Sequence, residues 1–450
     1  MRVAIYSPWP PQRSGIADYA AELLPHLARH AELRLICDPG ARPAPALVER
    51  FPVDDARALP GLLLSGAVDV VLYHLGNNRD YHSGIRRTLL AHPGVVVIHD
   101  VVLHDLVRET TLRRGDAAAY VEELRYCAGP TGERAARRSL QTGVPLDPQA
   151  WPLFERVVDR SLAVLVHNHY CRDRILRSRP LARVEVVPHH LSLGDTPPGA
   201  EARRRLGLPE DGLIIASFGF ITEAKRPLVL LRAFARLRER VPRARLVLAG
   251  AVSPHFDLKS RVGAGLLEGV TITGRLELEP FLLHMAACDV AVNLRWPTSG
   301  ETSGTLVRLL GLGKPLIVTE AGAFAELPDG CVAKVDPPGG DEEEQLFTYL
   351  ERLATDGDLR RMLGENARRH ATRHHAIEDS AAGYLRLLRE VVEDRPQPFE
   401  ALPPLAASRG ADVRGDLVAR VGRELCDLGL REDDPALDHV ARRLCEIAPA

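Results

Sequence analysis

The feature that most constrains the fold is a repeated alternation of short apolar runs with segments of helical length. In the first half, runs such as RVAIY, VDVVLYHL and GVVVIHD predict strands at 2–6, 33–37, 68–75, 94–100, 163–168 and 184–189. Segments of helical length lie between them, for example 17–31 and 83–90. Nearly continuous apolar strands separated by helices are typical of a parallel sheet covered on both faces. The pattern therefore predicts a doubly wound α/β domain.

The same alternation restarts after LSLGDTPPGAEA, residues 191–202, a Gly- and Pro-rich segment typical of a linker. Beyond it we expect strands at 213–219, 244–250, 270–274, 290–294, 315–320 and 331–335. A chain of 450 residues is too long for one ordinary core. We therefore predict an α/β chain of two tandem Rossmann-like, doubly wound domains, 1–190 and 203–376, which face each other across a cleft.

Two stretches break the alternation. Residues 103–142 carry arginines interspersed with glutamates on mostly helical sequence, which predicts a basic helical insertion in the first domain. We favour a lid over a substrate site for this insertion, with contact to anionic lipid headgroups as the alternative. Residues 391–450 predict a proline-rich spacer and a helical tail.

Composition excludes several classes of protein. The formal net charge of -2 does not point to nucleic acid. Seven cysteines without a CxxC pair argue for reduced thiols and against a zinc knuckle or disulfide framework. Apolar runs too short to span a bilayer, and an N-terminal run too short for a signal peptide, lead us to expect a cytoplasmic protein. The sequence carries no prediction of oligomeric state.

Polar residues stand at several predicted strand ends, where ligands bind in doubly wound sheets. Several of them together predict a polar cleft, and those of the first domain are His74, Asn77, His99, Asp100, His167, Asn168, His189 and His190. So many histidines also raise a metal site as an alternative. We favour hydrogen bonding, because carboxylates or thiolates at ligand spacing do not accompany them.

The second domain offers two loops suited to a charged ligand. In SFGFITEAKRP, Gly219 ends a strand, and Lys225 and Arg226 stand where a helix begins, which suits a pyrophosphate. A solvated Lys-Arg pair at a helix start is the alternative. In LRWPTSGETSG, Arg295 and Glu301 flank a loop of small residues that leads to a helix start, so that phosphate or sugar hydroxyls are expected at Thr302, Ser303 and Gly304. Glu301 as a helix cap is the alternative here.

The first strand leads into the stiff loop SPWPPQRSG. Three prolines restrict it, and Gly15 permits a close approach of backbone to ligand. A lone glycine does not make the dinucleotide fingerprint. We therefore expect this loop to be one wall of a shared site, with Arg13 and Ser14 directed toward a sugar or an acceptor.

The motifs in this order resemble nucleotide-sugar-dependent glycosyltransferases of the B-type fold, and most of all the retaining family 4, glycosyl transferases group 1. The resemblance covers about 2–388 and rests on PPQRSGIADYAAELLPHLA, HLGNN, HDVVLHDL, FGFITEAKRP, GAFAELPDG and the long run from TGRLELEP to GLGKP. It implies that the second domain binds a nucleotide diphosphate sugar, with Lys225 on the diphosphate, supplemented by Arg226, and Glu301 on sugar hydroxyls. It also implies that Gly15 and His99 line the cleft and that a helix at 377–390 crosses back to the first domain.

Two departures from the family pattern stand out. The family's second glutamate falls on Leu309 or, counted back from GKP, on Arg308, which puts the usual ribose contact in question. Arg308 then either favours another nucleotide or packs outward. Phe220 stands where the family often has arginine, and Arg226 is expected to replace that charge.

The resemblance implies transfer of a hexosyl group to an acceptor with retention of anomeric configuration and without a metal or other cofactor. The cations would stabilise the departing diphosphate, which can take the acceptor's proton. Alternatives are a sugar-nucleotide epimerase or phosphorylase of the same fold, and a non-catalytic partner protein.

Overall fold

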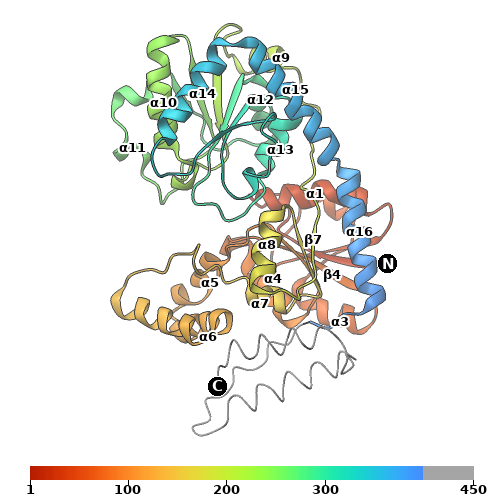
Figure 1. Ribbon diagram of the computed structural model, residues 1–450. Coiled ribbons are helices and arrows are strands. Elements are labelled where there is room, and N and C mark those ends of the chain that lie inside the picture. Colours follow the sequence, from red (N-terminus) through yellow and green to blue (C-terminus); the bar gives the residue numbers. More distant parts are fainter. Residues whose placement is uncertain (399–450) are drawn as a thin grey trace, which may run out of the picture. The chain divides into compact units, whose positions relative to one another are not determined.

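The computed structural model describes residues 1–398 and contains two parallel β-sheets (Figure 1). The first sheet has seven strands in the order β3-β2-β1-β4-β5-β6-β7, and the second has six in the order β10-β9-β8-β11-β12-β13. In both, the strand order reverses direction beside the first strand of the sheet, as in doubly wound folds. The predicted α/β class with two doubly wound sheets is confirmed. We call residues 1–186 together with α16 (Ile377–Asp394) the first lobe, and residues 199–374 the second lobe.

All six strands expected in the first lobe are present, although several are shorter than predicted. The strands are β1 (Arg2–Tyr6), β2 (Glu32–Cys37), β3 (Val53–Asp55), β4 (Val70–Leu75), β5 (Val95–Ile98), β6 (Ala163–Val166) and β7 (Val184–Val186). The edge strand β3 was not predicted, because its three residues, VDD, carry no apolar run. The helices are α1 (Gly15–Leu27), α2 (Pro45–Val48), α3 (Leu59–Leu64), α4 (Arg79–Ala91), α5 (His104–Thr110), α6 (Ala117–Thr142), α7 (Glu155–Asp159) and α8 (His169–Ser178).

The second lobe also contains every strand that was expected. These are β8 (Ile214–Phe218), β9 (Arg245–Ala249), β10 (Val270–Ile272), β11 (Val290–Asn293), β12 (Leu316–Thr319) and β13 (Ala333–Val335). The helices are α9 (Gly199–Leu206), α10 (Pro227–Arg240), α11 (Leu258–Arg261), α12 (Leu278–Ala287), α13 (Gly304–Gly311), α14 (Glu342–Thr355) and α15 (Gly357–His374). Helix α9 begins inside the segment 191–202 that was expected to be linker, because residues from Glu201 onward favour helix.

Each sheet has an apolar layer on both faces. Along β1, Val3 and Ile5 join one core cluster, while Ala4 and Tyr6 join another on the opposite face. This alternation follows from the twofold repeat of a strand. Burial on both faces explains why the strands read as continuous apolar runs, and it leaves the strand ends as the places where polar side chains can gather.

Helix α16 packs on the first lobe, beside α1 (Figure 1). Its buried residues Tyr384, Leu388 and Val391 belong to the same core cluster as Val3 and Ile5. The hydroxyl groups of Tyr19 in α1 and Tyr384 lie 2.9 Å apart. The helix runs to Asp394, so the spacer predicted from 391 begins later. The predicted helical tail lies outside the described residues.

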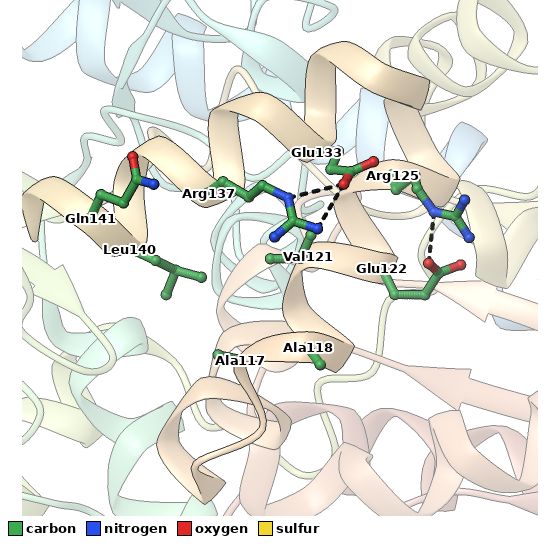
Figure 2. A pocket seen from close by; sticks show the side chains of 9 residues that line it. All are labelled: Ala117, Ala118, Val121, Glu122, Arg125, Glu133, Arg137, Leu140 and Gln141. Atoms are coloured by element: carbon green, nitrogen blue, oxygen red, sulfur yellow. Dashed lines mark hydrogen bonds and ion pairs between the residues drawn. The ribbon is translucent and has the colours of Figure 1, made fainter. Parts of the chain in front are cut away.

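The insertion at 103–142 consists of α5, a short turn and α6, which is kinked at Ala128 and Gly129. Figure 2 shows a groove along α6 that has a volume of about 640 Å³. Two of its arginines are paired on the same helix, Arg125 with Glu122 and Arg137 with Glu133 (Figure 2). These pairs neutralise part of the predicted basic character. The groove is lined by Ala117, Ala118, Val121, Glu122, Arg125, Glu133, Arg137, Leu140 and Gln141.

Within residues 1–398, every helix is too short or too polar to cross a membrane.

Candidate active site

The loop that follows β11 in the second lobe meets loops that follow β5 and β6 in the first lobe, and the loop after β8 contacts the β11 loop, where the amide of Trp296 donates to the carbonyl of Ala224 at 2.7 Å. Hydrogen bonds join the two sets directly: the amide of Val101 donates to the carbonyl of Ser299 at 2.9 Å, and Asn168 Nδ2 donates to the carbonyl of Gly300 at 2.8 Å. These loops follow the carboxyl ends of parallel strands, where ligands bind in doubly wound sheets. The site predicted from the sequence is therefore assembled from both lobes.

The side chain of Lys225 packs against the turn that follows β8. Its Nζ donates to the carbonyl of Phe218 at 2.5 Å. Gly219 has a φ of +85°, and a Cβ there would lie 2.6 Å from that Nζ, so the missing side chain makes room for the lysine. Burial, followed by the charge of Arg295, lowers the pKa of Lys225 well below its ordinary value, while Glu301 acts in the opposite direction. An anion bound at this turn would restore the favoured charged form of the lysine.

Arg226 is directed elsewhere. It has a φ of +55° and precedes Pro227, the first residue of α10. Its guanidinium forms a two-pronged ion pair with the buried carboxylate of Glu342 in α14, with 3.0 Å between Nε and Oε1 and 2.5 Å from the second prong to Oε2. The geometry therefore gives Arg226 a role in holding α10 against α14. The expected second cation on a diphosphate, in place of the arginine replaced by the exposed Phe220, is not supported by this placement.

Arg295 and Glu301 form a second charged pair in the loop after β11. Arg295 Nε lies 3.0 Å from Glu301 Oε1, and both side chains are less than one-fifth exposed. The other carboxylate oxygen of Glu301 accepts hydrogen bonds from the amide of Ser299 at 2.8 Å and the hydroxyl of Thr298 at 3.2 Å. The alternative that Glu301 caps α13 is wrong, because Ser303 is the N-cap residue. Glu301 is thus a preorganised acceptor beside the Arg295 cation and the buried amine of Lys225.

The start of α13 is held by its own cap and by the first lobe. Ser303 Oγ accepts from the amide of Leu306 at 3.3 Å and from Asn293 Nδ2 at 3.2 Å. Thr302 Oγ1 accepts from Asn168 Nδ2 at 2.9 Å. A Cβ at Gly304 would lie 3.2 Å from His189 Nε2. The side-chain oxygens of Thr302 and Ser303 thus accept hydrogen bonds within the protein, and the expectation that backbone amides at this helix start receive phosphate or sugar hydroxyls stays a prediction.

Asp100 is the first-lobe residue that faces this charged cluster. Its Oδ2 accepts a hydrogen bond from the amide of Asn77 at 3.0 Å, and Asn77 Oδ1 accepts from the amide of Leu106 at 2.9 Å. Burial, and next the negative charge of Glu301, raise the pKa of Asp100 to about 7. Two carboxyl groups, one from each lobe, thus share the field of Arg295. Such a pair has the electrostatics expected of a site that handles hydroxyl groups and protons.

Most of the histidines expected to line a cleft are buried. His74 is fully buried, and its Nδ1 lies 3.1 Å from Nε2 of the half-buried His99. His167 Nδ1 donates to the carbonyl of Val187 at 2.8 Å. Burial lowers the pKa of His74 to about 3 and that of His167 to about 4, so these rings are neutral at pH 7. Placing His74 in the cleft was therefore wrong: β4 is buried on both faces up to its last residue.

The buried histidines surround one aromatic ring. Ring centroids of His74, His99, His167, His189 and His190 lie between 4.2 and 5.9 Å from that of Tyr19. Among the described residues, His, Cys, Asp and Glu side chains do not form a group of three or more that could hold a metal ion. The expectation of hydrogen bonding over a metal role stays a prediction.

The loop after β1 offers backbone more than side chains. Ser14 is the N-cap of α1, and its Oγ accepts from the amide of Ile16 at 3.3 Å. Arg13 and Gly15 are exposed, and a Cβ at Gly15 would meet no atom within 4 Å. The start of α1 is therefore exposed, and its place as one wall of a shared site stays a prediction.

Arg308 neither packs outward nor points at the second-lobe loops. It crosses to the first lobe, where its guanidinium lies 2.6 Å from Oε1 of Glu22 in α1. Leu309, the other position considered for the family's second glutamate, is fully buried in the second-lobe core. The proposal that Arg308 packs outward is wrong, because α1 covers it.

Several residues that join the lobes were not singled out from the sequence. Glu22 pairs with Arg308, and Glu326 accepts hydrogen bonds from the amides of His169 and Tyr170 at the start of α8, at 3.0 and 2.5 Å. Such long-range pairs leave no local pattern. Asn168, at the end of β6, was noted only as a polar strand end, and its role as the α8 cap follows from its position before that helix.

Comparison with known proteins identifies the second lobe. Residues 212–356 match the family model described as "Glycosyl transferases group 1". This match contains β8 to α14, and with them Lys225, Arg295 and Glu301. The expected resemblance is confirmed for this part of the chain.

Curated relatives carry glycosyltransferase names. The chain is 32% identical over 225 residues to D-inositol 3-phosphate glycosyltransferase of Stackebrandtia nassauensis, covering 42% of this chain and 47% of that protein. It is 30% identical over 230 residues to the protein of the same name from Salinispora arenicola, covering 47% of this chain and 50% of that one. The chain thus spans about half the length of these relatives.

Solved structures share the fold at low sequence identity. Sucrose-phosphate synthase from Thermosynechococcus elongatus superposes with a TM-score of 0.62 at 17% identity, over 88% of this chain and 100% of that one. HepE from Anabaena, in complex with UDP and glucose, gives a TM-score of 0.60 at 14% identity, over 87% of this chain and 100% of that one. Residues 212–356 therefore resemble the glycosyl transferases group 1 family, and the described chain shares the two-lobed fold of these solved glycosyltransferase structures.

Proposed function

We propose that the protein is a hexosyltransferase of the cytoplasm that moves a sugar from a nucleotide diphosphate sugar to an acceptor hydroxyl, with retention of anomeric configuration. The observation that carries this proposal is the charged cluster at the lobe boundary. Arg295 provides positive charge, Lys225 gains its charge when an anion binds, Glu301 accepts hydrogen bonds beside them, and Asp100 faces them from the other lobe. A diphosphate needs the cations, and sugar hydroxyls need the acceptors.

The reaction requires one bond to break and one to form at the anomeric carbon. As the bond from that carbon to the diphosphate oxygen breaks, negative charge grows on the diphosphate, and Lys225 and the amides at the start of α13 stabilise it. The acceptor oxygen bonds to the anomeric carbon from the face that the diphosphate vacates. Its proton passes to the departing phosphate, so that no side-chain base and no cofactor is required. Contacts of loop 296–303 with the first lobe exclude water from this step.

Two comparisons support the choice of substrates. HepE, which shares the fold, was solved with UDP and glucose, and the relatives are named for D-inositol 3-phosphate. UDP-sugars as donors and a phosphorylated polyol as acceptor are therefore the first compounds to test. Under this proposal, the insertion formed by α5 and α6 covers the acceptor.

A donor screen tests the function. Thermal shift against a panel of nucleotide sugars identifies the best donor, and mass spectrometry with D-inositol 3-phosphate or cell extract identifies the product. We expect a product heavier than its acceptor by one hexosyl residue, with the anomeric configuration of the donor by NMR. Conversion of the donor to its epimer without acceptor, or a product of inverted configuration, would contradict the proposal.

Matched variants connect the activity to the site. Lys225→Ala should lower kcat/KM by about two orders of magnitude, the loss typical of one electrostatic group in a transition state. Lys334→Ala is the control, because Lys334 lies in the same lobe and its Nζ pairs with Asp329 at 2.6 Å. Equal activity of the two variants would show that the site is wrongly assigned.

A further inference from the structure

The ion pair between Arg308 and Glu22 joins helices that belong to different lobes. Arg308 lies in α13 and Glu22 in α1, and 2.6 Å separate the guanidinium from Oε1. The side chains are 14% and 18% exposed. The two residues are 286 positions apart in the chain. This contact is therefore a property of how the lobes meet.

The segment that connects the lobes braces the same pair. Arg308 Nε donates to the carbonyl of Ser192 at 3.0 Å, and the second oxygen of Glu22 lies 3.2 Å from Nε2 of the buried His190. Both carboxylate oxygens of Glu22 are thus engaged. The next residues are held as well, because the amide of Leu191 donates to the carbonyl of His375 at 2.7 Å. First lobe, connection and second lobe meet at one point.

Both helices carry the site at their starts. Glu22 is seven residues after Gly15, the first residue of α1, and Arg308 is four residues after Gly304, the first residue of α13. At 1.5 Å per residue, these spacings are roughly 10 and 6 Å. Because helices are stiff over such lengths, fixing Glu22 against Arg308 also fixes the two helix starts relative to each other.

A charged pair suits a boundary that must open and close. Replacing a buried ion pair by apolar residues is often neutral or stabilising, so stability alone does not account for the pair. Charged groups regain their hydration when they separate, whereas apolar side chains would be left exposed to water. An ion pair at this boundary holds the lobes together in one geometry without a large penalty for separation.

We infer that Arg308 and Glu22 are positioning residues of the transfer reaction, which set the angle at which the two lobes present their halves of the site to one substrate. This inference rests on the proposed function. It gives a role to the arginine at one of the two positions, Arg308 and Leu309, considered for the family's second glutamate: the residue serves lobe closure, and its partner comes from the other lobe. Neither residue is assigned a contact with the substrate.

A double-mutant cycle tests the inference. Glu22→Gln removes one charge with little change of shape, whereas Arg308→Gln removes one charge and also shortens the side chain, which loses the hydrogen bond to Ser192. Glu22→Arg, Arg308→Glu and their combination reverse the charges. We expect each single variant to lower kcat/KM by about ten-fold, mainly through kcat, since a coupling of about 1.4 kcal/mol corresponds to one decade. The combined reversal should exceed either single reversal in activity.

An intralobe pair provides the matched control. Arg86 and Glu123 also lie 2.6 Å apart, with side chains 13% and 8% exposed, but both belong to the first lobe. Arg86→Gln should lower the melting temperature as much as Arg308→Gln or more, while leaving kcat/KM within about two-fold when assayed well below melting. The comparison separates an effect on stability from an effect on lobe geometry.

Small-angle X-ray scattering reads lobe geometry without any activity. We expect a larger radius of gyration for Glu22→Gln and Arg308→Gln than for wild type and Arg86→Gln, and recovery in the combined reversal. Unchanged scattering in both single variants, or a combined reversal no better than the worse single one, would overturn the inference. If wild type transferred no sugar from any donor, the proposed function would fail, while the scattering would still decide on the ion pair.

Discussion

Gly300 is the point at which a single added methyl group should oppose lobe closure. It lies in the second-lobe loop between Arg295 and Ser303, and it is buried against the first lobe. Its φ is +79°, and a Cβ would lie 2.7 Å from Cys171 Sγ and 2.9 Å from Val101 Cγ1. Gly300→Ala therefore combines backbone strain with overlap across the lobe boundary.

The two costs can be separated in magnitude. A left-handed conformation costs an L-residue roughly 1 to 2 kcal/mol. Overpacking against side chains costs about 1 to 3 kcal/mol more. Because the overlapping atoms belong to the other lobe, opening of the lobes removes the overlap. The overpacking therefore destabilises only the closed state. At about 1.4 kcal/mol per decade, kcat/KM should fall by roughly 5- to 100-fold.

Gly143→Ala is the matched control. Gly143 also has a positive φ, +71°, at the end of α6, but a Cβ there would meet no atom within 4 Å. Both variants should lose a few degrees in melting temperature, as measured by scanning calorimetry. Only Gly300→Ala should lose transfer activity in a nucleoside diphosphate release assay. If kcat/KM of the two variants agreed within two-fold, the closed contact between loop and first lobe would not belong to the reaction.

Three further predictions concern charge and stability. Asp100 has its pKa raised to about 7, so the folded state binds the proton more tightly than the unfolded chain. The contribution of this group to stability therefore falls as pH rises from about 4 to 7. In urea titrations, the unfolding free energy of Asp100→Asn should rise relative to that of wild type over this range, by at most about 1.4 kcal/mol per pH unit. A gain that shrinks as pH rises would contradict this sign. His74, His82 and His167 have lowered pKa values, of about 3, 4 and 4. The stability that they contribute is complete above about pH 6.5 and is lost as pH falls toward 4, so the unfolding free energy from urea titrations should fall over that interval by up to about 1.4 kcal/mol per pH unit for each ring. An unfolding free energy that stays constant over this interval would show that these rings are not buried in the neutral form. Arg203→Met removes the partner of Asp289, 2.6 Å away, and should lower the unfolding free energy by about 2 kcal/mol. Arg205→Ala, which removes an exposed ion pair with Glu201, should lower it by less than about 1 kcal/mol. Equal losses would mean that burial of the Arg203–Asp289 pair is unimportant.

The strands and their order of occurrence were predictable because buried parallel strands carry a strong local signal. Runs such as GVVVIHD and VDVVLYHL are short, rich in β-branched residues and apolar throughout, which favours strands of a sheet covered on both faces. The exception, β3, is a three-residue edge strand with two aspartates, and it forms by pairing with β2. The start of helix α9 was not predicted, because the Gly and Pro residues before it indicated a linker as far as residue 202, whereas the helix begins at Gly199.

The site was predictable in its parts and not in its connections. Lys225, Arg295 and Glu301 follow strands that end at the same sheet edge, so their proximity follows from topology. Whether a polar side chain at that edge faces the cleft depends on partners far away in the chain. Arg226 turns to Glu342, which is 116 positions away, and Arg308 turns to Glu22. His74 was predicted to line a cleft because it lies near the end of a strand. The sequence does not show that neighbouring elements bury this end of the strand.

Calorimetric titration with UDP and GDP tests the central claim, that the lobe boundary binds a nucleotide diphosphate through Lys225. The account predicts that wild type binds at least one of them with a Kd below about 1 mM, a modest affinity of about 4 kcal/mol, and that Lys225→Ala loses this binding while Lys334→Ala keeps it. Absence of binding to wild type at millimolar concentration, or full binding by Lys225→Ala, would contradict it.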